Sequence, residues 1–388
     1  MSFSDPCRIA QWAIFCRVVD NFGDIGVCWR LARCLSSEHG LQPTLWVDDW
    51  AALRRLVPAA EMPDSIVDGV RLRHWRDDFP EVDAADVVIE AFACELPASY
   101  IDKMARRVPA PQWINLEYLS AEPWVEACHG LGSPHPRLPL TKHFFFPGFD
   151  PKTGGLLREC DLLAERAAFR AQGRAAPAWL AAMGLADLPA EALLVSLFAY
   201  EQPDLPRLLE QWQQSGTPVV VLVPEGRVLP DLARALGRER IKAGDHVQLD
   251  SLRVQVLPFS EPSAYDRLLW ACDLNFVRGE DSFVRAQWAG RPLVWQIYHQ
   301  DEGVHLDKLE AFLDRYCRGL GKEAEIALRT FWRAWNGVGT PAEAWSAYVA
   351  VLPELRGHAE RWCDELALCD DLATALTKFC SHSGRTAG

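Results

Sequence analysis

The chain has 388 residues, 49% of them hydrophobic and 24% charged, which is typical of a globular protein with room for two domains. Its formal net charge of −13 argues against nucleic-acid binding, which needs basic residues to neutralise phosphates. The twelve cysteines include no Cys-x-x-Cys pair, which disfavours a zinc ribbon or a redox motif. Because we find no signal-peptide pattern and no apolar run long enough for a membrane span, we expect a cytoplasmic protein with reduced thiols and no membrane partner.

In the first half, short apolar runs alternate with amphipathic runs, which predicts a mainly parallel sheet with helices on both faces. The expected strands are Trp12–Val19, Pro43–Asp48, Val70–Trp75, Ala85–Ala91 and Gln112–Glu117. The expected helices include Ile25–His39, Trp50–Leu56 and Ser99–Arg107.

The middle of the chain changes in character. From Gly130 to Gly155, glycine, proline, histidine and phenylalanine dominate, which predicts irregular structure. From Arg158 to Leu180 the chain is rich in alanine, which predicts a helical connector.

A second alternation begins at Ala192. Its expected strands are Leu193–Phe198, Pro218–Val223, Arg253–Leu257, Leu274–Val277 and Leu293–Ile297. Its expected helices include Leu205–Gln214, Pro262–Ala271 and Ser282–Ala289. The tail from Ala342 onwards reads as helical, with a break or kink near Pro353 and Gly357.

This order predicts an α/β fold with two Rossmann-like, doubly wound domains that face each other across a ligand-binding cleft. The expected boundaries are 1–185 for an N-terminal acceptor-binding domain and 186–355 for a C-terminal nucleotide-sugar-binding domain. Residues 356–388 are expected to form a helical segment that packs back on the N-terminal domain.

The turn between the first strand and the first helix is the most informative segment. It reads Asp20-Asn21-Phe22-Gly23-Asp24 and places two carboxylates beyond the carboxyl end of a strand, where α/β domains present functional groups. Asp24 also suits a plain helix N-cap, whereas Asp20 would end an apolar strand, where aspartate is depleted. The two acids favour a site for a cation or a proton.

Two other kinds of site are disfavoured. The turn lacks the Gly-x-Gly-x-x-Gly pattern of dinucleotide binding, which weakens a nicotinamide oxidoreductase hypothesis. No Asp-x-Asp occurs anywhere, and the histidines show no recognised zinc spacing. We therefore expect no metal and no cofactor.

A second turn of mixed charge joins the strand at Leu274–Val277 to the following helix. It reads Arg278-Gly279-Glu280-Asp281-Ser282. Arg278 could bind a phosphate with two parallel hydrogen bonds, and Glu280 could accept a hydrogen bond from a ribose hydroxyl. Backbone amides near Ser282 would face an anion from a helix N-terminus, although Asp281 or Ser282 could equally be a simple cap.

Aromatic residues stand at other strand ends of the second half. Phe198, Tyr200 and Phe259, with Tyr265 nearby, could stack on a nucleobase, although core packing is the commoner fate of such side chains.

These two turns, together with Gly290-Arg291-Pro292 and Trp295-Gln296-Ile297-Tyr298, resemble the motifs of the EarP family of bacterial protein-arginine rhamnosyltransferases, which are GT-B glycosyltransferases. The resemblance covers essentially the whole chain. It implies an inverting, metal-independent enzyme that moves L-rhamnose from dTDP-β-L-rhamnose to an arginine of translation elongation factor P.

The resemblance also implies roles for individual residues. Asp20, Asp24 and Glu280 would be the functional acids. The substrate-binding residues would be Asn21, Phe22, Gly23, Phe198, Tyr200, Phe259, Arg278, Gly279, Asp281 and Ser282. We expect Asp20 to take the proton as the C–N bond forms, while Asp24 orients the guanidinium.

Two alternatives remain open at this stage. The chain could be a GT-B enzyme with another nucleotide sugar and acceptor, or a non-catalytic binding partner of a translation factor.

Overall fold

The computed structural model describes residues 10–19, 22–174, 176–299 and 303–383, and it divides the chain into two compact units. The first unit comprises residues 1–160 with 367–388, and the second comprises residues 161–366. These boundaries differ from the expected ones at 185 and 355. Helix α5 (Leu162–Arg170) packs on α9 (Pro262–Ala271), and Arg166 and Arg170 donate to carbonyls at the end of α10 (Asp281–Ala289), so the supposed connector is part of the second unit.

The first unit contains an eight-stranded sheet of order β3-β4-β2-β1-β5-β6-β8-β7. Its inner strands are parallel: β4 (Val70–His74), β2 (Gln42–Val47), β1 (Gln11–Cys16), β5 (Val87–Ala91), β6 (Gln112–Leu116) and β8 (Thr141–Phe145). Taken alone, these six follow the 3-2-1-4-5-6 order of a Rossmann fold. The strand order therefore reverses between β1 and β5, the place where such folds bind ligands.

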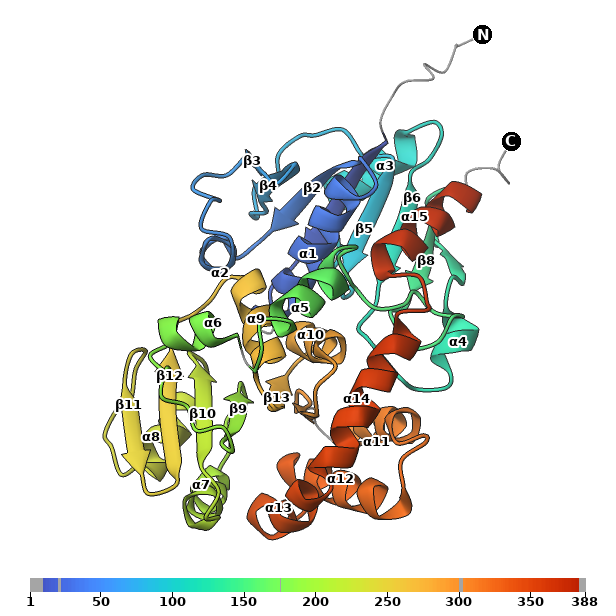
Figure 1. Ribbon diagram of the computed structural model, residues 1–388. Coiled ribbons are helices and arrows are strands. Elements are labelled where there is room, and N and C mark those ends of the chain that lie inside the picture. The colour runs from blue at the N-terminus through green and yellow to red at the C-terminus, as the bar shows by residue number, and fades with distance from the viewer. Residues whose placement is uncertain (1–9, 20–21, 175, 300–302, 384–388) are drawn as a thin grey trace. The chain divides into compact units, whose positions relative to one another are not determined.

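Burial explains why these strands lie centrally. Every residue of β5 is buried, and only Gln11 of β1 is exposed, as expected for strands covered on both faces. The covering helices α1 (Gly23–Ser37), α2 (Trp50–Leu56) and α3 (Ala98–Arg106) follow β1, β2 and β5 in the chain (Figure 1).

The expectation of irregular structure from Gly130 to Gly155 is partly wrong. After the short helix α4 (Val125–Cys128), β7 (Gly132–Pro134) and β8 form a hairpin there, and β8 pairs in parallel with β6. Sequence reasoning missed the two strands because the surrounding segment is rich in proline and glycine, like a loop, although Thr141–Phe145 itself has the composition of a strand. The edge strand β3 (Ser65–Val67) was missed because it is only 3 residues long.

The second unit contains a six-stranded sheet of order β11-β12-β10-β9-β13-β14 (Figure 1). Its parallel strands are β12 (Leu252–Leu257), β10 (Val219–Pro224), β9 (Leu193–Leu197), β13 (Leu274–Arg278) and β14 (Leu293–Gln296), and β11 (His246–Leu249) pairs antiparallel at the edge. The order of these strands reverses between β9 and β13. The second unit is therefore also Rossmann-like.

Helices α6 (Pro177–Ala182), α7 (Leu205–Gln214), α8 (Leu229–Ala235), α9 and α10 precede β14 in the chain, and α7, α9 and α10 pack on strands of the second sheet. A bundle of α11 (Val304–Tyr316), α12 (Lys322–Trp335), α13 (Pro341–Ala350) and α14 (Leu352–Leu366) follows β14. Gly357 lies inside α14, so the expected break there is wrong, whereas Pro353 stands at the start of that helix, where proline is tolerated. None of the described helices is both long and apolar enough to cross a membrane.

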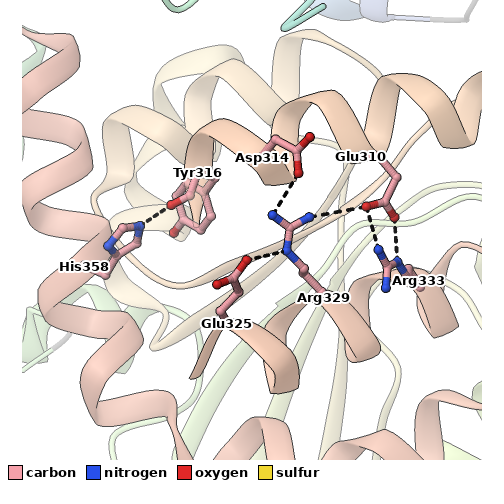
Figure 2. A network of polar contacts seen from close by, with 7 residues as sticks. All are labelled: Glu310, Asp314, Tyr316, Glu325, Arg329, Arg333 and His358. Atoms are coloured by element: carbon pink, nitrogen blue, oxygen red, sulfur yellow. Dashed lines mark hydrogen bonds and ion pairs between the residues drawn. The ribbon is translucent and has the colours of Figure 1, made fainter. Parts of the chain in front are cut away.

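Charged side chains tie α11 to α12. Arg329 reaches Glu310, Asp314 and Glu325, and Arg333 forms a bidentate pair with Glu310 (Figure 2). Such a network fixes the register of two adjacent helices more than it adds stability, because exposed ion pairs contribute little individually.

The last helix, α15 (Leu372–Ser383), belongs to the first unit. It packs against α1, its Phe379 ring lies 5.6 Å from that of Phe145 in β8, and Cys380 O accepts a hydrogen bond from Gln112 Nε2 at 2.7 Å. In Figure 1 it lies beside β6 and β8. The chain therefore crosses to the second unit after residue 160 and returns after residue 366.

Candidate active site

Two carboxylates hold the loop after β1. The backbone N–H of Val18 donates to Asp48 Oδ1 at 2.9 Å, and that of Val19 donates to Asp24 Oδ2 at 2.8 Å. Asp48 follows the neighbouring strand β2, and Asp24 lies in the first turn of α1. The strand ends at Cys16 rather than at the expected Val19, so this loop is longer than predicted. The backbone at Val18 and Val19 is therefore fixed beside the point where the strand order reverses.

Asp24 is the predicted acid of the first unit that the structure describes. It is only 3% exposed, and its second oxygen, Oδ1, accepts a hydrogen bond from the Tyr118 hydroxyl at 3.3 Å. The plain N-cap interpretation is wrong, because Phe22 is the N-cap residue and Asp24 is the second residue of α1. The amino end of the helix dipole still stabilises its negative charge.

The other predicted residues of this turn fall into two groups. Asp20 and Asn21 lie outside the described residues, so their roles stay predictions. Phe22 and Gly23 stand at the start of α1, and the Arg55 guanidinium lies 5.6 Å from the centre of the Phe22 ring. The structure thus brings Phe22, Gly23 and Asp24 together at one helix start.

A thiol nucleophile is disfavoured near this turn. Cys16 ends β1, and a hydrogen bond with Cys28 together with burial raises its pKa well above the usual value for cysteine. The thiol therefore stays protonated at neutral pH, and a protonated thiol is a weak nucleophile. The carboxylates remain the reactive groups of this loop.

In the second unit, the predicted loops after β9 and β13 come together. The Arg278 guanidinium carbon lies 4.6 Å from the centre of the Phe198 ring and 4.5 Å from that of Tyr200. Arg278 and Tyr200 are only 6% and 7% exposed. A buried cation that contacts two aromatic rings is restricted in orientation and poorly hydrated, which strengthens its attraction for an anion.

The start of α10 is fastened to the end of β13. Ser282 Oγ accepts the N–H of Arg278 at 3.1 Å and donates back to Arg278 O. Gly279 has φ +59°, which glycine adopts without strain, and its carbonyl accepts the Trp295 indole N–H at 2.8 Å. Glu280, not Asp281 or Ser282, is the N-cap residue of α10, and Asp281 occupies its first turn.

Neighbouring side chains hold the β9 loop. Gln296 Oε1 accepts the N–H of Tyr200 at 2.8 Å, and Gln296 Nε2 donates to Glu201 O at 3.2 Å. The Tyr265 ring packs edge-on against Phe198 with centres 5.6 Å apart, and burial raises the pKa of Tyr265, which keeps its hydroxyl neutral. Phe259 follows β12 at the same edge of the sheet, two strands away from β9.

Sequence reasoning missed two residues, one in each unit. Arg227 follows β10, and its guanidinium lies 5.4 Å from the centre of the Tyr200 ring and 2.9 Å from Glu201 Oε1. Tyr118 follows β6 and bonds Asp24. Neither belongs to a motif, but both stand just beyond the carboxyl end of a parallel strand, and that position could have identified them.

The two sites differ in chemistry. The loops of the second unit present a buried cation, aromatic rings and a helix N-terminus, which suit a nucleoside diphosphate. The first turn of α1 presents a fixed carboxylate, which suits a cationic or proton-donating acceptor. Within the described ranges, no three His, Cys, Asp or Glu side chains group so as to hold a metal ion. Two Rossmann-like units with these sites define a glycosyltransferase of the GT-B class.

Comparison with known proteins specifies the family. A family model described as Elongation-Factor P (EF-P) rhamnosyltransferase EarP matches residues 12–381, so the chain belongs to the EarP family. A protein-arginine rhamnosyltransferase of Pseudomonas aeruginosa is 53% identical over 373 residues, which span 96% of this chain and 99% of that protein. A protein-arginine rhamnosyltransferase of Shewanella oneidensis is 38% identical over 409 residues, which span 98% of this chain and 100% of that protein. The chain is accordingly an arginine-modifying rhamnosyltransferase.

Solved structures agree with this conclusion. The chain matches a solved structure described as showing the structural basis for EarP-mediated arginine glycosylation of translation elongation factor EF-P. The identity is 40% and the TM-score is 0.68, and the match covers 96% of this chain and 99% of that one. LpCGTa in complex with UDP matches with 14% identity, a TM-score of 0.52 and coverage of 98% and 100%, which supports the fold alone.

Proposed function

We propose that the chain transfers L-rhamnose from dTDP-β-L-rhamnose to an arginine side chain of translation elongation factor P, with inversion at the anomeric carbon. The observation that carries the proposal is the buried Arg278 guanidinium at the end of β13, which lies over the rings of Phe198 and Tyr200. Such a cradle recognises a nucleoside diphosphate, and the EarP relatives are arginine rhamnosyltransferases.

On the donor side, Arg278 and the first backbone N–H groups of α10 stabilise the negative charge that develops on the departing diphosphate. Phe198, Tyr200 and Phe259 are the proposed stacking partners of the nucleotide, and Glu280 accepts a ribose hydroxyl. These groups supply the charge stabilisation that a metal ion supplies in other transferases, so the proposed reaction is independent of metal.

On the acceptor side, a guanidinium nitrogen attacks the anomeric carbon as the bond from that carbon to the diphosphate oxygen breaks. A single displacement from the opposite face inverts the configuration. Since the pKa of a guanidinium is far above that of aspartic acid, its proton leaves only as the C–N bond forms. Asp20 and Asp24 divide proton acceptance and orientation of the guanidinium between them.

Incubation of the protein with dTDP-β-L-rhamnose and elongation factor P tests the proposal. Mass analysis should find one added deoxyhexose on one arginine, and NMR should identify the α-anomer. If elongation factor P binds the protein but stays unmodified, the protein is a non-catalytic binding partner. If only another sugar nucleotide supports turnover, dTDP-β-L-rhamnose is not the donor.

Two further arms test the chemistry. Excess EDTA should leave turnover unchanged, whereas loss that Mg²⁺ restores would contradict metal independence. Asp20→Asn and Asp24→Asn should each lower kcat by about 10²–10⁴-fold if each contributes to proton transfer or its alignment. The variant that loses kcat while it keeps acceptor affinity identifies the base.

A further inference from the structure

Tyr118 stands where three strands of the first sheet end side by side. Strand β5 lies between β1 and β6. The segments that follow these three strands carry Asp24, Phe92 and Tyr118, which contact one another through Tyr118. Tyr118, after β6, donates its hydroxyl to Asp24 Oδ1 at 3.3 Å, while Asp24 Oδ2 accepts the Val19 N–H at 2.8 Å. Both oxygens of the Asp24 carboxylate are thereby held, one by the backbone and one by Tyr118.

The ring of Tyr118 is held as well. It stacks on Phe92, after β5, with ring centres 4.4 Å apart and planes 16° from parallel. The stack fixes the plane of the Tyr118 ring, and a fixed ring keeps the hydroxyl pointed in one direction.

The loop that carries Phe92 is strained. Phe92, Ala93 and Glu95 have φ of +56°, +53° and +55°, a conformation that costs non-glycine residues about 1 kcal/mol or more each. Buried Glu90 holds the loop by accepting the Glu95 N–H at 3.1 Å, and Glu90 is itself paired with Lys142 at 2.8 Å. The surrounding structure therefore enforces a loop shape that supports the Tyr118 ring.

Exposure separates Tyr118 from an ordinary core residue. Its side chain is 41% exposed, whereas the Asp24 carboxylate beneath its hydroxyl is 3% exposed. A residue that served only packing would be expected inside the core. Tyr118 instead links the surface to the buried acid.

We propose that Tyr118 is a positioning residue for the transfer reaction: its hydroxyl, aimed by the Phe92 ring, orients the Asp24 carboxylate toward the acceptor guanidinium. The inference rests on the proposed function of Asp24. Since misalignment of a reacting group by about 1 Å can cost about 10²-fold in rate, loss of this hydrogen bond should reduce kcat rather than donor affinity.

The test compares Tyr118→Phe with Tyr100→Phe. Tyr100 lies in the same unit, and its hydroxyl accepts the Ala85 N–H at 3.1 Å in the core, away from Asp24. Tyr118→Phe should lower kcat by about 10- to 100-fold, with unchanged dTDP affinity and unchanged Tm. Tyr100→Phe should lower Tm and leave kcat unchanged. Phe92→Leu should lower kcat in the same direction as Tyr118→Phe, because the hydroxyl loses its support.

Two results would overturn the inference. One is wild-type kcat for Tyr118→Phe, and the other is a fall in kcat matched by a fall in Tm, which would make the role structural. Failure of the proposed function is a distinct outcome, because then the wild-type protein would not modify elongation factor P at all.

Discussion

At the scale of single residues, the site depends on side chains fixed by their neighbours. Arg278 is buried and its guanidinium lies over two aromatic rings, and its backbone N–H and C=O both form hydrogen bonds with the Ser282 hydroxyl. Arginine suits this position because its planar guanidinium stacks on aromatic faces and binds phosphate bidentately, neither of which lysine reproduces.

Replacement of Arg278 by lysine should weaken dTDP binding by about 10- to 100-fold, because hydrogen bonds to charged groups contribute about 1.5–3 kcal/mol. Calorimetric titration with dTDP measures the effect. Arg227→Lys is the matched control: this arginine touches the same Tyr200 ring, but its side chain is 42% exposed, so the loss should be smaller. Equal losses for the two variants would contradict the role given to Arg278.

At the scale of elements, α10 links the donor loop to the core of the second unit. Arg285 in α10 forms a bidentate pair with Asp266 in α9 at 2.8 and 2.9 Å, with side chains 1% and 6% exposed. The other end of α10 is held by Arg166 and Arg170. The helix that presents its N-terminus to the nucleotide is therefore fixed along its length.

Asp266→Asn should destabilise the second unit by about 3–5 kcal/mol, because it removes the negative charge that pairs with the buried Arg285 guanidinium. The paired replacement Asp266→Leu with Arg285→Met should cost less than the single change. Denaturant unfolding of the three proteins checks this order, and a single variant as stable as the wild type would refute it.

Helix α14 packs on α11 through a titratable contact. His358 Nε2 lies 2.5 Å from Tyr316 O, and burial lowers the pKa of His358 below its usual value of 6.5, although the hydrogen bond opposes the shift (Figure 2). The folded protein therefore binds this proton less readily than the unfolded chain. The contribution of neutral His358 to the stability of the folded state is therefore complete above about pH 6.5 and is lost as the pH falls below that value.

The free energy of unfolding should accordingly decrease below pH 6.5, by at most about 1.4 kcal/mol per pH unit for each such histidine. His358→Gln removes the titration and keeps a donor for Tyr316 O, so its unfolding free energy should depend less steeply on pH. Some slope should remain, because burial also lowers the pKa of His129. An unchanged slope in His358→Gln would contradict the assignment.

At the scale of the whole molecule, the chain order interleaves the two units. The second unit is inserted between residues 160 and 367 of the first, and α15 completes the first unit from the far end of the sequence. Leu372, Ala373 and Leu376 of α15 are buried there. The stability of the first unit therefore depends on α15, which is more than 200 residues away from residues 1–160 of that unit in the sequence.

Removal of residues 367–388 should lower the unfolding temperature of the first unit and leave dTDP affinity unchanged, because the proposed dTDP site lies in the second unit. Leu376→Ala is a milder control that should cost about 2–5 kcal/mol in the first unit by opening a cavity. Calorimetric melting with and without dTDP measures both, since a ligand stabilises only the unit that binds it. Loss of dTDP binding on truncation would refute this division.

The sequence by itself determined the elements that are long and strongly patterned. Each predicted strand is present, and α2, α7 and α9 have the predicted bounds, because hydrophobic periodicity reflects burial directly. It also determined the family, and it identified the loops after β9 and β13 that the structure brings together. Short edge strands such as β3 and β7 carry too few residues for a periodic signal.

Only the tertiary structure decided which chain segments share a unit and which side chains share a site. The assignment of α5 to the second unit and of α15 to the first depends on contacts between residues far apart in sequence. The same holds for Tyr118, which is 94 residues from Asp24, and for Arg227 beside Tyr200. Local pattern carries no information on such pairs, because the order of strands in a sheet sets which loops become neighbours.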